Sequence, residues 1–190
     1  MQNKTKLRVD IEALRGLSVI LVILYHFKLE NLDFQIIKGG FLGVDIFFVI
    51  SGFLITKIII EDIEIERFHL KDFYLRRIRR IIPLVLCVTF ISYIAAYFIL
   101  FPDELEEFKK SFFFVNVFLS NFWYYLKGDY FSPITDNDPL IHFWSLSVEE
   151  QYYLIYPILF IFFFNQKKIR NFLLIIILIA FFSFILTQLG

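Results

Sequence analysis

Long apolar stretches alternate with short polar segments along most of the chain. A helix needs about 20 mostly apolar residues to cross a bilayer, within a range of about 17–25. Six stretches approach or reach that length: residues 14–27, 41–60, 81–101, 111–126, 148–164 and 171–189. The pattern therefore predicts an all-α protein, a polytopic bundle of transmembrane helices with five or six membrane segments.

The fourth stretch departs from a regular span. Residues 111–126 are apolar but short, and they include Asn116, Ser120 and Asn121. A full crossing here would also place the basic segment 167–170 on the side opposite the other basic segments. We therefore predict that residues 111–126 form a re-entrant or interfacial segment.

Basic residues orient the predicted spans, because cytoplasmic loops of membrane proteins collect Lys and Arg. Most of the 19 basic residues precede the first stretch, separate the second from the third, or separate the fifth from the sixth. We expect these three segments, and hence the N-terminus, to be cytoplasmic. The intervening loops, including the acidic residues 103–107, are expected on the outside.

Composition narrows the class of protein further. Of 190 residues, 58% are hydrophobic and 21% aromatic, whereas soluble domains average about 45–50% apolar residues. This excess argues against a soluble enzyme domain or a disordered chain. The net charge of zero argues against a nucleic-acid partner. The single cysteine, Cys87, cannot form an internal disulfide.

Arg15 and His26 are the first ionisable residues in the apolar pattern. They are eleven residues apart, so on a helix they share a face and lie about 16 Å apart along its axis. A histidine in a polar cavity can act as a general base near neutral pH. An arginine that snorkels to the surface and an interfacial histidine explain the same pair without function, and the two residues alone favour that explanation.

Glycines surround the next acidic residue. The run Gly-Gly-Phe-Leu-Gly-Val-Asp occupies residues 39–45, and Ser51-Gly52 follows. Glycine permits tight turns and close approach of the backbone to a ligand, and Asp45 could orient His26 from the same side of the membrane. The alternative is helix packing through small residues from Gly43 to Gly52.

Four arginines precede the third stretch: Arg76, Arg77, Arg79 and Arg80. Guanidinium groups bind phosphates bidentately, so the cluster is a candidate phosphate clamp. A topology signal explains it equally well.

The fourth group occupies residues 140–151. Ser147 and Glu150 fit a capping box that would start the following helix. This leaves Glu149, His142 and Trp144 unexplained at the expected outer membrane edge. We predict no metal site, because no Cys/His cluster is present, and we expect His69 to be a solvated surface residue.

These groups together resemble one family. Arg15 with ten residues before His26, then GGFLGVDIFFVISGFLI, FYLRRIRRIIP and HFWSLSVEEQYY, follow in the order found in the acyltransferase-3 family, over about residues 8–157. Its members are bacterial membrane O-acetylases of lipopolysaccharide, peptidoglycan and other surface glycans. The resemblance implies a single domain of about ten transmembrane helices in the bacterial cytoplasmic (inner) membrane. Residues 1–190 would be its N-terminal part.

The resemblance also implies a reaction and a set of roles. An acyl group, most simply acetyl from acetyl-CoA, would pass to a hydroxyl of an extracytoplasmic carbohydrate. His26 would act as general base, or carry the acyl group itself, with Asp45 orienting it and Glu149 as a second acid–base group. Trp144 and Glu150 would contact the acceptor. The CoA phosphates would be held by Arg15, Arg76, Arg77, Arg79 and Arg80.

Two other classes remain open from the sequence. One is half of a transporter or flippase, in which Arg15, His26 and Asp45 form a proton or substrate path. The other is an inactive structural fragment. Besides membrane lipids and a carbohydrate acceptor, the sequence predicts no partner, and it makes no prediction of oligomeric state.

Overall fold

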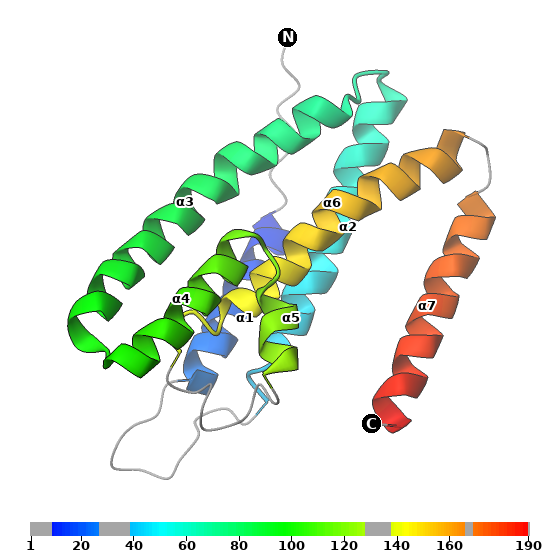
Figure 1. Ribbon diagram of the computed structural model, residues 1–190. Coiled ribbons are helices and arrows are strands. Elements are labelled where there is room, and N and C mark those ends of the chain that lie inside the picture. Colours follow the sequence, from blue (N-terminus) through cyan, green and yellow to red (C-terminus); the bar gives the residue numbers. More distant parts are fainter. Residues whose placement is uncertain (1–8, 27–38, 128–137, 166–168, 190) are drawn as a thin grey trace. The chain divides into compact units, whose positions relative to one another are not determined.

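The computed structural model describes residues 9–26, 39–127, 138–165 and 169–189 (Figure 1). Every regular element in these ranges is a helix, which confirms the all-α prediction. The helices are α1 (Val9–His26), α2 (Leu42–Glu64), α3 (Leu70–Ile99), α4 (Pro102–Asn116), α5 (Ser120–Leu126), α6 (Phe143–Asn165) and α7 (Ile169–Leu189). The chain divides into two compact units, Met1–Arg67 and Phe68–Gly190, which are described separately below.

In the first unit, α1 packs against α2 through glycines. A Cβ on Gly43 would overlap the carbonyl oxygen of Ser18 and lie 2.9 Å from Val22 Cγ2. A Cβ on Gly40 would lie 2.6 Å from Tyr25 Cβ. Only a hydrogen fits at either position, so the two backbones approach closely. The sequence allowed two roles for the glycines, helix packing or approach of the backbone to a ligand. At Gly43 the structure shows the packing role.

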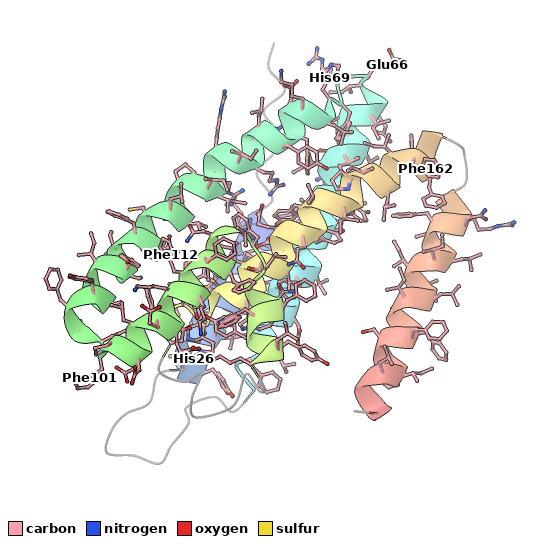
Figure 2. All side chains as sticks on the ribbon, viewed as in Figure 1. His26, Glu66, His69, Phe101, Phe112 and Phe162 are labelled. Carbon is pink, nitrogen blue, oxygen red and sulfur yellow. The ribbon has the colours of Figure 1, made fainter. Side chains whose placement is uncertain are left out.

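The second unit contains α3 to α7. Its core includes Val85 and Ala96 of α3, Phe108 and Val115 of α4, and Leu140 just before α6. After α3 the chain reverses into α4 at a turn where Figure 2 shows Phe101. Pro102 opens α4, and the N–H of Phe101 donates to Glu104 Oε2 at 3.1 Å. The reversal places α4 beside the second half of α3.

The stretch 111–126 is not a single helix. It is broken between α4 and α5, where Phe118 has a φ of 56°, a left-handed conformation that costs a non-glycine residue roughly 1–2 kcal/mol. Figure 1 shows the chain turning back at this break, so that α5 runs opposite to α4. The stretch therefore belongs to two short helices, and its re-entrant or interfacial position stays a prediction.

Several helices begin before their apolar stretches, and in two of them the earlier start brings candidate site residues into the helix. α3 begins at Leu70 rather than near residue 81, so the four arginines lie within it. α6 begins at Phe143 rather than at 148. The predicted capping box is therefore wrong, because Ser147 lies inside α6. It is buried, and its Oγ is 2.7 Å from Ser120 Oγ.

Much of the described surface is apolar. Within the described residues, α2 and α3 are long and apolar enough to cross a membrane. Large side chains are exposed on α3, where Phe98 is 80% exposed, and along most of α7. Soluble monomers rarely expose contiguous apolar patches above a few hundred Å². These features indicate a membrane protein.

Candidate active site

His26 is the last residue of α1 and is exposed (Figure 2). Its Nδ1 lies 2.9 Å from the carbonyl oxygen of Val22. A carbonyl only accepts hydrogen bonds, so Nδ1 must carry the proton. In the neutral ring Nε2 then holds the lone pair that a general base needs. The ring of Tyr25 meets the imidazole edge-on, with 5.0 Å between ring centroids.

Asp45 lies deeper along the same helix pair. The contact of Gly43 with Ser18, and that of the Arg15 guanidinium with the Phe47 ring at 5.1 Å, fix an antiparallel register. In this register Asp45 is level with residues 16–17, about 14 Å along the axis from His26 at 1.5 Å per residue.

This separation exceeds the reach of a direct hydrogen bond. The hydrogen bond that the structure shows for the ring of His26 is the one to the carbonyl oxygen of Val22, and the orienting role of Asp45 stays a prediction. Asp45 instead lies between the levels of Arg15 and His26 on the α1–α2 pair.

In the second unit, α3 and α6 are joined by two contacts. The hydroxyl of Tyr74 donates to the carbonyl oxygen of Leu154 at 2.7 Å. The guanidinium of Arg77 lies over the Tyr153 ring at 4.6 Å and over the Phe73 ring at 5.5 Å. The later residue on α3, Arg77, contacts the earlier residue on α6, Tyr153. The two helices are therefore antiparallel here.

Two carboxylates lie beside this junction. Glu149 is 8% exposed, and it accepts a hydrogen bond from the hydroxyl of Tyr153. Oε1 of Glu150 is buried and has no hydrogen-bond partner among the described residues. Arg77 interacts electrostatically with both carboxylates. We call Arg77, Tyr153, Glu149 and Glu150 the Arg77 cluster.

The cluster corrects the sequence-based placement of its members. The apolar stretches placed the arginines at the inner membrane surface and Glu149, Glu150 and Trp144 at the outer edge. The structure instead brings both carboxylates to the level of Arg77. The placement was wrong because α3 and α6 both begin before their apolar stretches. Trp144 lies in the first turn of α6, just ahead of the cluster.

The other three arginines differ from Arg77. Arg76, Arg79 and Arg80 are exposed, whereas Arg77 is half-buried. Residues three and four apart are neighbours on a helix, so these three share one face of α3. They form an exposed cationic surface on a helix that is otherwise apolar towards its C-terminal end.

Sequence reasoning missed Asp138, which ties three elements together. Its Oδ2 accepts hydrogen bonds from Ser111 of α4 and from Tyr124 of α5, the latter at 3.1 Å. Its Oδ1 accepts one from the N–H of Leu140 at 2.9 Å. Asp138 also lines a cavity of 240 Å³ together with Leu100, Glu104, Glu107, Phe108, Lys127 and Pro139.

The polar residues of the broken stretch also have partners. Asn121 contacts the side-chain amide of Gln151, which donates to Asn121 Oδ1 at 2.9 Å and to the carbonyl oxygen of Phe118 at 2.8 Å. Asn116 accepts a hydrogen bond from Thr89 at 3.3 Å. The signal for this network was present in the sequence as polar residues within an apolar stretch. Gln151 and Ser147 flank the carboxylates, so the network supports that part of α6.

Comparison with known proteins decides the family. The model of a family described as an acyltransferase domain matches residues 8–189. The chain belongs to the acyltransferase-3 family. The match covers both compact units, and it includes every residue that the sequence singled out for chemistry.

Relatives of this acyltransferase-3 chain carry names that state an activity. It is 38% identical over 164 residues to the O-acetyltransferase OatA of Staphylococcus aureus, an alignment that covers 85% of this chain and 26% of the relative. It is 40% identical over 175 residues to the peptidoglycan O-acetyltransferase OatA of Listeria monocytogenes, covering 89% and 26%. The chain thus spans about a quarter of the length of these relatives.

A third relative is an uncharacterized protein of Haemophilus influenzae. It is 43% identical over 146 residues, which cover 76% of this chain and 59% of that protein. No solved structure matches the chain.

The acyltransferase-3 chain offers no ready metal site in its described part. Within residues 9–26, 39–127, 138–165 and 169–189, no group of three or more His, Cys, Asp or Glu side chains could hold an ion. His69 lies just before α3 and is exposed, as expected for a surface residue.

Proposed function

We propose that this chain carries out part or all of a membrane-bound O-acyltransfer reaction, as an O-acetyltransferase. The acyl group would move from a cytoplasmic acyl-CoA, most simply acetyl-CoA, to a hydroxyl of an extracytoplasmic carbohydrate. The observation that carries the proposal is the hydrogen bond from His26 Nδ1 to the carbonyl oxygen of Val22, which makes Nε2 the unprotonated nitrogen of the neutral ring. The O-acetyltransferase names of the two OatA relatives support the same reaction.

His26 has a definite task in this reaction. Its Nε2 removes the proton of the acceptor hydroxyl while the hydroxyl oxygen attacks the thioester carbon. The new C–O bond forms, the C–S bond breaks, and the sulfur leaves with the proton that the imidazolium returns. Asp45, near the level of Arg15, stabilises the imidazolium by its charge rather than by a direct bond.

Cationic residues bind the donor in this proposal. Arg76, Arg79 and Arg80 bind the CoA phosphates, since their guanidinium groups are exposed on one face and match phosphate geometry. Arg15 is a second anchor. The donor supplies the activated thioester, and no metal is required by these steps.

The acceptor side is assigned to the start of α6. Glu149 acts as a second acid–base group, Glu150 binds an acceptor hydroxyl, and Trp144 stacks on a sugar ring. Peptidoglycan is the first acceptor to examine because the Listeria monocytogenes relative is named for it, and lipopolysaccharide is the next.

Membrane placement completes the proposal. Residues 1–190 form part of a single polytopic acyltransferase-3 domain in the bacterial cytoplasmic membrane, with a cytoplasmic N-terminus. The apolar helices α2 and α3 and the exposed apolar surface support a membrane location. The clustering of basic residues supports the orientation.

Acetyl transfer in sealed vesicles tests the proposed function. Inside-out vesicles from cells that express the gene encoding this chain receive acetyl-labelled acetyl-CoA on the outside, which is the original cytoplasmic face. We expect label on lumenal carbohydrate, and none in vesicles without the gene. Carbohydrate movement that needs no acetyl-CoA would instead support a transporter, and absence of label with both acceptors would contradict the proposal.

A further inference from the structure

Arg77 does not resemble a phosphate ligand in its surroundings. It is half-buried, and its guanidinium lies over the rings of Tyr153 at 4.6 Å and Phe73 at 5.5 Å. A guanidinium over an aromatic face is attracted by the negative charge of that face, most strongly where water is excluded. Arg76, Arg79 and Arg80 lie on the same helix but are exposed. The four arginines therefore differ in their surroundings: Arg77 packs on aromatic rings, whereas the other three are exposed.

Arg77 is also linked to the carboxylates through a shared ring. Tyr153 lies under the guanidinium of Arg77 and donates its hydroxyl to Glu149. Arg77 further interacts electrostatically with Glu149 and Glu150, and less favourably with Arg80. Arg77 thus faces two carboxyl groups across the junction of α3 and α6, and a phosphate bound there would have to lie beside them.

We propose that Arg77 is a positioning residue, which fixes Tyr153 and through it Glu149, and that it does not bind the donor phosphates. The inference rests on the proposed function. It assigns phosphate binding on α3 to Arg76, Arg79 and Arg80 alone. If this assignment is right, a substitution of Arg77 changes the rate only of the reaction step in which Glu149 takes part.

Two donors separate these roles. Acetyl-CoA carries phosphates, whereas S-acetylpantetheine presents the same thioester without them. Arg79→Gln should raise KM for acetyl-CoA and leave the kinetics with S-acetylpantetheine unchanged, because the lost contact is to a phosphate. Arg77→Gln should lower kcat by about tenfold or more with both donors, at unchanged KM, as expected for a residue that acts on the chemical step.

A third variant tests the link through Tyr153. Tyr153→Phe keeps the ring under Arg77 but removes the hydroxyl that bonds Glu149. We expect it to lower kcat like Arg77→Gln, and the double variant to be no slower than either single one, because residues in one network are not additive. The pH profile of kcat should change in the same way in all three proteins.

Several outcomes would overturn the assignment. One is a rise in KM for acetyl-CoA in Arg77→Gln that disappears with S-acetylpantetheine, since it would make Arg77 a phosphate ligand. Another is an unchanged kcat in Tyr153→Phe. This second test remains possible if the Arg77→Gln protein does not accumulate in the membrane. A wild-type protein that transfers no acetyl group from either donor would refute the proposed function instead.

Discussion

Single glycines decide how closely α1 and α2 approach. We predict that Gly43→Ala destabilises the protein by about 1–3 kcal/mol, the usual cost of an extra methyl group in a tight contact. The added Cβ would overlap the Ser18 carbonyl and press on Val22. The melting temperature of the purified protein in detergent measures the effect.

Gly16→Ala is the matched control for that substitution. Gly16 also lies in a helix of the first unit, but a Cβ there meets nothing within 4 Å. Replacing this helical glycine by alanine should raise stability by roughly 0.5–1 kcal/mol. Equal melting temperatures for the two variants would contradict the close contact at Gly43.

At the residue scale, the role of His26 as a base is a prediction that comes from the family resemblance. Its spacing to Arg15 alone favoured an explanation without function. Its partner Val22 could not be chosen, because every helical position has a carbonyl four residues before it. Asp45 was assigned to His26 because both were expected on one side of the membrane, whereas the register set by Gly43 separates them by two to three turns.

At the scale of elements, one ion pair, Glu107–Lys127, joins α4 to the C-terminal end of α5. Lys110 and Lys127 donate to the carboxylate of Glu107, at 2.6 Å and 3.0 Å, and these hydrogen bonds hold the pKa of Glu107 below its usual value of 4.5. A carboxylate with a lowered pKa stabilises the folded state above its unfolded pKa. That contribution is lost as the pH falls through the folded pKa.

We therefore predict a small acid-dependent loss of stability that depends on Lys127. In wild-type protein the unfolding midpoint should fall as the pH drops below about 4.5, the ordinary value for a glutamate. Lys127→Met should flatten this dependence, because Glu107 loses one of its two partners. The effect is modest and screened by salt, since both side chains reach the surface.

Lys109→Met controls for the change in charge. Lys109 pairs with Glu106 within α4, at 2.5 Å, and does not bridge to α5. It should leave the acid dependence as in wild type. Denaturant unfolding at a series of pH values measures all three proteins, and identical pH profiles for the two variants would argue against the bridge from Glu107 to Lys127.

Helix boundaries explain what sequence reasoning missed at this scale. Hydropathy marks where a helix is apolar, not where it begins. Lys, Arg and Glu are good helix formers, so α3 starts at Leu70 and carries the arginines in its second and third turns. α6 likewise includes Glu149 and Glu150 in its second turn. The antiparallel contact of these polar turns created the Arg77 cluster, which no apolar stretch could indicate.

At the scale of the whole molecule, the sequence predicted the class and the family correctly. The all-helical architecture is observed throughout the described residues. The family match covers residues 8–189, as four motifs in one order implied. Those motifs are divided between the two compact units, with His26 and Asp45 in the first, and the four arginines and both carboxylates in the second. The proposed reaction therefore requires both units.

The rate of acetyl transfer by His26→Ala tests the central proposal most directly. The assay is transfer of label from acetyl-CoA to lumenal carbohydrate in inside-out vesicles, with His69→Ala as the matched control because His69 is an exposed histidine outside the site. Loss of a general base costs about 10²–10⁴-fold in rate. We predict a loss of this size for His26→Ala and a wild-type rate for His69→Ala. A wild-type rate for His26→Ala would contradict the account.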